Sequence, residues 1–395
     1  MSLSGIIGGN CITLLRNGAE YFPALEDAIN RAQKEVHLET YIFEHDFTGI
    51  RIARALQNAA KRGVATHLLL DGFGSQDLPR SVIQEMLNAG VQVLIFRQKI
   101  STFSLRRNRL RRMHRKLAVV DASIAFIGGI NIIDDLHNPE PLPPRFDYAV
   151  SIQGPLMADI YPAVRHLWML VAWAHFNHRL IDSPVLHPSE KPCGCQRAAF
   201  VIRDNLRHRH DIEQAYLYAI ASAVSEIIIA SAYFLPGINF RRALSDASRR
   251  GVRVILLLQG RVDHRLQYYA THALYGSLLE AGIEIYEYHK SFLHAKVAVI
   301  DRHWATVGSS NIDLFSLLLA REANVVVEDA AFADELRSSL ELAMAEGSLR
   351  VMGENWKRQF WVFRGMSWAS YYVVRYLQGL MGYGWEDTRS ENSKS

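Results

Sequence analysis

Hydrophobic and polar residues alternate along this chain in two kinds of block. Amphipathic stretches that end near a glycine are followed by short apolar runs, as in residues 59–72, "AAKRGVATHLLLDG", and residues 87–96, "LNAGVQVLIF". Glycine readily takes the left-handed conformation that ends a helix, and a short apolar run is typical of a buried strand. The pattern therefore predicts alternating helices and strands in a largely parallel sheet that is covered on both faces.

The same blocks recur later in the chain and in the same order. The matched pairs are residues 28–43 with 219–234, 59–72 with 247–260, and 87–96 with 279–288. A repeat on this scale predicts a duplicated domain. We expect one α/β lobe over residues 1–182, a linker rich in Pro and Ser over 183–196, a second lobe over 197–352, and a tail over 353–395.

Composition narrows this picture in two ways. With 395 residues, of which 49% are hydrophobic, the chain is long enough for two or three domains with real cores. The net charge is only +4, but six arginines fall within residues 106–115, around His114. This cluster indicates either an anionic partner or a solvated basic loop. Three cysteines provide neither a disulfide framework nor a zinc site, which fits a reducing compartment.

Membrane contact is expected without a membrane span. No stretch reaches the roughly 18 consecutive apolar residues that a spanning helix needs, and the first residues lack the pattern of a signal peptide. Residues 356–385 instead mix Trp, Tyr and Phe with Lys and Arg, a composition typical of a membrane interface. A helix hairpin packed on the core is the alternative.

One motif occurs in both predicted lobes: His-x-Lys, four residues, Asp, six residues, Gly-(Gly or Ser), one residue, Asn. Its members are His114, Lys116, Asp121, Gly128, Gly129 and Asn131 in the first copy and His294, Lys296, Asp301, Gly308, Ser309 and Asn311 in the second. Residues i and i+2 of a strand share a face, so each His points the same way as its Lys. If a pseudo-twofold axis relates the lobes, the two histidines can meet in one pocket.

Such a pocket suits the chemistry of a phosphodiester. The two lysines can neutralise the nonbridging oxygens, with Asn131, Asn311 and Ser309 as further phosphate-binding groups. One imidazole can attack phosphorus while the other protonates the leaving alkoxide. No metal or other cofactor is required, and a Lys two residues from each His would repel a divalent ion. His37, His45 and His137 with nearby acidic residues are the weaker, metal-binding alternative.

Carboxylates are expected to orient the two histidines. Asp147 and Glu322 each begin an apolar strand and lie at similar distances after the two motifs, which predicts this role. Asp121 and Asp301 belong to the candidate catalytic motif, although their position at strand ends before a turn favours a structural role.

The twin motifs resemble those of the phospholipase D superfamily. Stretches such as "LETYIFEHDFTG", "DYAVSIQGP" and "SAYFLPG" are similar to bacterial cardiolipin synthases, especially the B type, and the resemblance covers most of residues 14–329. It implies two α/β/α sandwich lobes with the active site at their pseudo-twofold interface. It also implies a covalent phosphohistidine intermediate and no metal.

The resemblance further implies a reaction. One phosphatidylglycerol would form a phosphatidyl-histidine and release glycerol, and a second phosphatidylglycerol would then attack to give cardiolipin. His114 would be the nucleophile and His294 the acid and then the base. Glu39, Tyr41 and Asp71 could shape the acceptor pocket, with packing roles equally expected. The enzyme would lie on the cytoplasmic side of the bacterial inner membrane, bound peripherally to an anionic membrane surface and not to nucleic acid.

Three alternatives stay open from the sequence. A hydrolase of the same superfamily would make phosphatidic acid, because water would replace the second lipid. A nuclease of the superfamily would use the arginines of residues 106–115 as a phosphate clamp. A noncatalytic lipid-binding scaffold would predict decay of at least one motif, and both motifs are intact.

Overall fold

The computed structural model describes residues 5–97, 112–135, 143–175, 185–204, 207–313, 320–354 and 361–380. The elements of the N-terminal half are β1 (Ile7–Arg16), α1 (Asn17–Arg31), β2 (Glu35–Thr40), α2 (Phe47–Lys61), β3 (Ala65–Asp71), α3 (Arg80–Asn88), β4 (Gln92–Phe96), β5 (Arg112–Met113), β6 (Lys116–Val120), β7 (Ile124–Gly128), β8 (Tyr148–Gln153) and α5 (Met157–Ala174).

The C-terminal half repeats much of this order and adds a last helix. Its elements are β9 (Gln196–Arg203), α6 (Asp211–Ser222), β10 (Glu226–Ser231), β11 (Phe234–Leu235), α7 (Ile238–Arg249), β12 (Arg253–Gln259), α8 (Arg265–Glu280), β13 (Glu284–Tyr288), β14 (Lys296–Ile300), β15 (Trp304–Gly308), β16 (Ile312–Asp313), β17 (Ala320–Glu328), α10 (Ala330–Gly347), β18 (Ser348–Arg350) and α12 (Trp361–Leu380).

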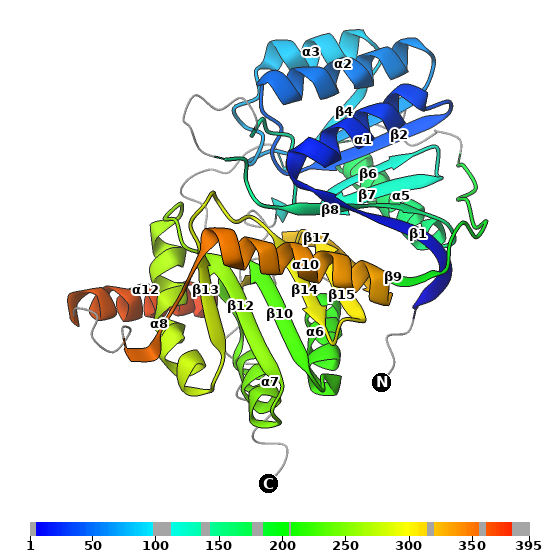
Figure 1. Cartoon of the computed structure of the whole chain (residues 1–395). Helices are drawn as coiled ribbons and strands as arrows, with labels where there is room; N and C mark the ends of the chain where they lie inside the picture. Colours follow the sequence, from blue (N-terminus) through cyan, green and yellow to red (C-terminus); the bar gives the residue numbers. More distant parts are fainter. Residues whose placement is uncertain are drawn as a thin grey trace.

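A single sheet of 16 strands runs through both halves, in the order β18-β13-β12-β10-β14-β15-β17-β9-β1-β8-β7-β6-β2-β3-β4, with β5 paired to β17. The N-terminal half lies above the C-terminal half in Figure 1, and the halves join where β1 pairs with β9. The sheet is therefore continuous across the boundary between the repeats.

The prediction of a largely parallel sheet was wrong. In the large sheet only β2-β3-β4, β10-β12-β13 and the short pair β5-β17 run parallel, and the other pairs are antiparallel. The repeated motif is the reason, because it folds back on itself as the hairpins β6-β7 and β14-β15. Asp121 and Ala122 both have φ of 52°, and this left-handed pair makes the tight turn that an antiparallel hairpin requires.

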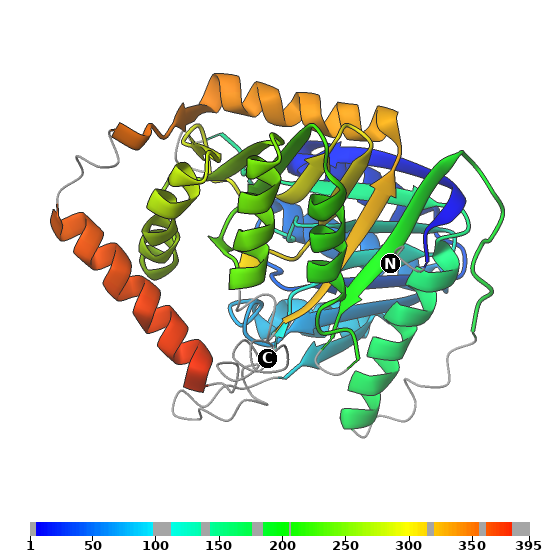
Figure 2. The same ribbon diagram turned by 90° about the horizontal axis from the view of Figure 1, so that it is seen from below.

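Helices cover both faces of the sheet, as Figures 1 and 2 show. Two adjacent residues of β6, which point to opposite faces, illustrate this. Ala118 packs into a core with α1, α2 and α3, whereas Leu117 packs into a core with α5 and α10. The second core also takes Val297 from β14 and Leu336 from α10, so the two halves share it. The α/β/α sandwich is confirmed, and the halves form one packed body.

Two local expectations hold in detail. Gly63 and Gly251 follow α2 and α7 with φ of 88° and 90°, the left-handed conformation expected after a helix. Among the helices that the structure describes, none is both long and apolar enough to cross a bilayer. The last of them, α12, lies along α8 at the edge of the molecule (Figure 2).

Candidate active site

The backbone ties each motif histidine to the opposite half of the molecule. His114 follows β5, which pairs with β17, and its backbone N–H donates to Arg321 O at 3.0 Å. In the same way, Leu293 forms a β-bridge with Phe146, and the N–H of His294 donates to Phe146 O at 2.9 Å. Each histidine is therefore held beside a residue that immediately precedes a carboxylate of the other half.

The side chains repeat this crossed arrangement. His114 Nδ1 lies 3.0 Å from Glu322 Oε1, and His294 Nδ1 lies 2.6 Å from Asp147 Oδ2. Both carboxylates are buried, whereas the two imidazoles are 17% and 21% exposed. A carboxylate that accepts the Nδ1 proton fixes the ring and leaves Nε2 free to react. Both Nε2 atoms are therefore available to a bound substrate.

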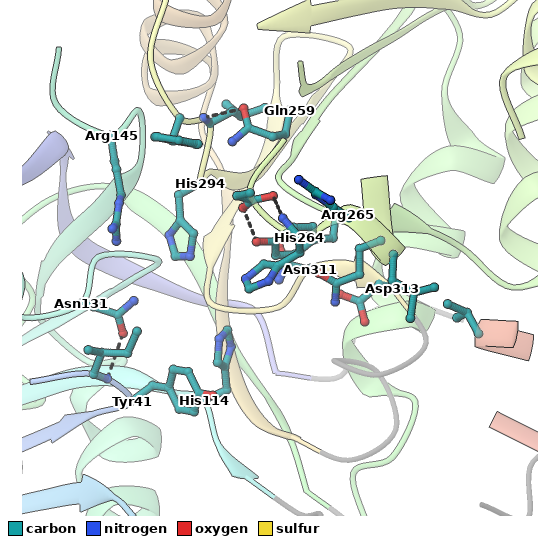
Figure 3. A pocket seen from close by; sticks show the side chains of 18 residues that line it. Tyr41, His114, Asn131, Arg145, Gln259, His264, Arg265, His294, Asn311 and Asp313 are labelled. Carbon is teal, nitrogen blue, oxygen red and sulfur yellow. Dashed lines mark hydrogen bonds between the residues drawn. The ribbon is translucent and has the colours of Figure 1, made fainter. Parts of the chain in front are cut away.

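His114 and His294 line one cavity of about 770 Å³, which they approach from opposite halves of the molecule (Figure 3). Asn131 and Asn311 also line this cavity. Tyr41 also lines the cavity, and its ring lies edge-on to His114 with 4.7 Å between centroids. The volume of this cavity lies within the range that is typical of small-molecule binding sites.

The two motif lysines are buried and are not among the residues that line the cavity. Lys116 Nζ donates to His114 O at 2.7 Å, and Lys296 Nζ donates to His294 O. Burial lowers the pKa of Lys116 to about 7 and that of Lys296 to about 8, although Glu322 and Asp147 oppose the shift. The charge of each lysine therefore depends on pH close to neutrality.

The same burial sets the protonation of the imidazoles. Burial lowers the pKa of His114, and for His294 the ammonium groups of Lys296 and Lys116 lower the pKa further. Burial also raises the pKa of Asp147 to about 6, against the opposing charge of Lys296. In the free protein at pH 7 both rings are therefore neutral, with Nε2 unprotonated. An incoming phosphodiester carries the negative charge that would favour protonating one of them.

The two carboxylates differ in their support. Ser309 Oγ donates to Glu322 Oε2 at 2.5 Å. The corresponding residue of the first motif is Gly129, where a Cβ atom would collide with the carboxylate of Asp147. Each half therefore accommodates the carboxylate that it contributes. Ser309 donates its hydroxyl to the longer Glu322, and Gly129 leaves room for the carboxylate of Asp147.

Comparison with known proteins connects this geometry to a family. A family model described as "Cardiolipin synthase, PLD-like domain" matches residues 25–137 and 216–343, which are corresponding parts of the two halves. The chain belongs to this family. Cardiolipin synthase B of Shigella flexneri and of Escherichia coli (strain K12) are each 38% identical over 385 residues, which cover 95% of this chain and 90% of the relative.

More distant matches agree. Cardiolipin synthase A of Pseudomonas fluorescens is 34% identical and covers 86% of this chain and 70% of the relative. The crystal structure of a phosphatidylserine synthase from Haemophilus influenzae superimposes with a TM-score of 0.68 at 11% identity, over 88% of this chain and 89% of that one, which shows the shared fold. The resemblance inferred from the motifs is confirmed. As a member of the cardiolipin synthase family, the chain is a phosphatidyltransferase-type enzyme.

The motif aspartates of this cardiolipin synthase family member lie away from the cavity, at the far ends of β6 and β14. Each carboxylate accepts hydrogen bonds from three consecutive backbone N–H groups. They are those of Gln33, Lys34 and Glu35 for Asp121 and those of Val224, Ser225 and Glu226 for Asp301. The structure thus places both where they hold a neighbouring strand, which is the structural role that their position favoured.

Asp121→Ala should destabilise the protein without impairing its chemistry. The loss of an acceptor for three N–H groups should lower the free energy of unfolding by about 2 kcal/mol, whereas kcat of the folded enzyme should change less than about threefold. Urea unfolding and lipid turnover measure the two effects. Asp27→Ala removes an exposed carboxylate from α1 and is the control, expected within about 0.5 kcal/mol of the parent. A hundredfold loss of kcat at unchanged stability would return Asp121 to the catalytic machinery.

Two of the three residues suggested for the acceptor pocket lie elsewhere. Glu39 accepts two hydrogen bonds from the buried Arg115, both at 2.8 Å. Asp71 accepts from the backbone N–H groups of Met113 and Phe73. Neither lines the cavity. Arg115 is therefore neutralised internally and cannot act as an exposed anion clamp, and the arginines of residues 106–111 lie outside the described residues.

Sequence reasoning missed several residues of the cavity wall. Arg145 stands two positions before Asp147, so the i, i+2 rule for extended chains could have identified it. Gln259 Oε1 accepts the backbone N–H of Leu293 at 3.1 Å and so positions the second motif. Tyr233 donates to Asp263 at 2.5 Å across the wall. No local pattern in the sequence distinguishes these last residues from other polar and aromatic residues.

The metal alternative reduces to a buried cluster outside the cavity. Within the described residues, Glu35, His37 and His67 form the one group of potential ligands close enough to share an ion. The two imidazoles stack at 4.3 Å with an interplanar angle of 9°, so their in-plane lone pairs run parallel and do not converge on one point. Arg165 lies 3.3 Å from the carboxylate of Glu35. His137 lies outside the described residues.

Proposed function

We propose that the protein transfers a phosphatidyl group from one phosphatidylglycerol to another, which yields cardiolipin and glycerol. The observation that carries this proposal is the pair of imidazoles in one cavity, each held at Nδ1 by a carboxylate of the opposite half. Two oriented imidazoles supply both a nucleophile and an acid for one phosphorus atom.

The reaction runs in two balanced steps. Nε2 of His114 attacks phosphorus as the P–O bond to the glycerol headgroup breaks, and protonated His294 gives its proton to the departing glycerol oxygen. The neutral His294 then removes the proton from a headgroup hydroxyl of the second lipid. That oxygen attacks phosphorus, the P–N bond breaks, and His114 is regenerated together with the protonated His294.

The surrounding residues have defined parts in this scheme. Glu322 stabilises the charge that develops on the imidazole of His114 during attack, and Asp147 does the same for His294. The amides of Asn131 and Asn311 and the guanidinium of Arg145 line the cavity as donors to the phosphoryl oxygens. The buried charges of Lys116 and Lys296 favour the same anionic group.

The lysines predict an alkaline limit to substrate capture. As pH rises through about 7 to 8, Lys116 and Lys296 lose their charge in the free enzyme, so kcat/KM should fall. A bound phosphodiester raises both pKa values, and kcat should fall only at higher pH. Rate profiles from pH 6 to 10 measure both limbs. Lys116→Gln should shift the limb in kcat/KM, whereas Lys290→Gln, at an exposed lysine paired with Glu346, should leave it in place. Identical limbs in kcat and kcat/KM would contradict this reading.

The setting follows from the substrate. A phospholipid substrate resides in a membrane, and the positive net charge of the chain favours an anionic bilayer surface. We place the enzyme peripherally on the cytoplasmic side of the bacterial inner membrane, with lobes over residues 1–182 and 197–352, a linker over 183–196 and a tail over 353–395.

One assay tests the proposal against its alternatives. Purified protein is mixed with phosphatidylglycerol vesicles, and the lipid products are identified by mass. Cardiolipin with equimolar glycerol is expected. Phosphatidic acid alone would assign a hydrolase, and no product together with digestion of DNA would assign a nuclease.

A further inference from the structure

Helix α12 carries an exposed face of aromatic and apolar side chains. Its most exposed large side chains recur three, four and seven residues apart, which places them on one side of the helix: Met366, Trp368, Tyr372, Val373 and Tyr376, each 44% to 67% exposed. Gly365 and Ala369 fill the same arc and are also exposed. The exposed large side chains of this arc are therefore Trp, Tyr, Met and Val, and the half-buried Arg375, seven residues after Trp368, lies at its edge.

The opposite face of α12 is fixed to the enzyme. Ser367 and Val374 are each 1% exposed. Phe363 packs edge-on against Tyr269 and His272 of α8, with ring centroids 5.4 and 5.5 Å apart. Because this contact sets the rotation of the helix, the exposed arc points outward in a defined direction.

The packed face of α12, opposite the arc, borders the active-site cavity. Val374 of α12 lines the cavity that also contains His114 and His294. At the start of α8, Leu266 lines the same cavity and is 41% exposed, and the nearby Val262 is 49% exposed. Apolar residues therefore line one side of the entrance to the active-site cavity.

We propose that this arc of α12 lies in the interfacial layer of a phospholipid bilayer and holds the cavity mouth against the lipid headgroups. The inference rests on the proposed function, because a lipid substrate gives the bilayer as partner. Trp and Tyr favour the membrane interface, and a helix with one apolar face can lie in its plane. A lipid can then present its phosphate to His114 while its acyl chains remain in the bilayer.

The test separates membrane docking from catalysis. The variant Trp368→Ser/Tyr372→Ser/Tyr376→Ser should bind vesicles of phosphatidylglycerol and phosphatidylcholine at least tenfold more weakly in sedimentation, and its turnover on vesicles should fall similarly. Its turnover of monodisperse dihexanoyl-phosphatidylglycerol should match the parent. Tyr218→Ser is the matched control. Tyr218 is 44% exposed on α6, one turn before the end of that helix. That end lies near Val224, whose N–H donates to Asp301, away from the cavity.

A second measurement does not depend on the triple variant. Trp368→Phe preserves the packing of the helix, and the fluorescence lost on substitution isolates the signal of Trp368. Brominated lipids in the vesicles should quench that signal by at least twofold. Unchanged sedimentation of the triple variant, or no quenching of Trp368, overturns the inference. If the triple variant binds vesicles more weakly but the parent forms no cardiolipin from either substrate, the proposed function is refuted and the docking surface remains supported.

Discussion

His114→Ala should reduce cardiolipin formation by about 10⁴-fold or more, because it removes the atom that forms the covalent intermediate. His294→Ala should lower the rate by about 10² to 10⁴, the usual contribution of a general acid. Neither histidine can replace the other, because a different carboxylate orients each of them: Glu322 holds His114, and Asp147 holds His294. Mass analysis of products from phosphatidylglycerol vesicles measures both losses.

An activated substrate distinguishes the two roles. A phosphatidyl ester of p-nitrophenol has a leaving group that needs no proton, so His294→Ala should still release a burst of p-nitrophenol close to one per enzyme. His114→Ala should release none. The opposite result would make His294 the nucleophile, and substantial cardiolipin from either single variant would contradict a shared site.

The crossed carboxylates should show the second-largest effect. Glu322→Gln should slow the burst by about 10² to 10⁴, as expected when a nucleophilic imidazole loses the carboxylate that orients it. Asp147→Asn should leave the burst nearly intact and slow cardiolipin formation, because it acts through His294. Both substitutions preserve shape and hydrogen bonding, so thermal unfolding should show only small changes.

A double-mutant cycle tests the pairing itself. With the activated substrate and vesicle acceptor, Asp147→Asn should add little to His294→Ala, since residues that act as a unit are not additive. Combined with Glu322→Gln it should add its full effect. If Asp147→Asn is silent only in the absence of His114, then each histidine uses the carboxylate of its own half, and the crossed geometry is wrong.

Much of the local structure could be predicted from the sequence because it depends on neighbours in the chain. The apolar runs became strands, the glycines after α2 and α7 took the left-handed conformation, and the motif became a hairpin in both halves. The parallel sheet was mispredicted for a related reason. Helix–strand alternation is visible in both halves, but the return of β7 beside β6 depends on a two-residue turn at Asp121 and Ala122.

Other features of the site depended on burial, which a sequence pattern does not report. Arg115 belongs to a conspicuous basic cluster, yet its guanidinium is paired with the buried carboxylate of Glu39. Lys116 and Lys296 are buried, and each donates to the backbone carbonyl of its own motif histidine. Tyr233 and Arg145 reach the cavity wall from connecting segments in different halves, and only packing brings them together.

By itself, the sequence determined that two histidines with matching lysines and asparagines would occupy equivalent places in two equivalent lobes, because identical local patterns fold alike. Only the tertiary structure decided which carboxylate serves which histidine. His114 and Glu322 are 208 residues apart, and His294 and Asp147 are 147 apart. These contacts arise where β5 pairs with β17 and Leu293 pairs with Phe146, between halves. Pairing between distant strands depends on how the lobes dock, and no periodicity within either lobe encodes it.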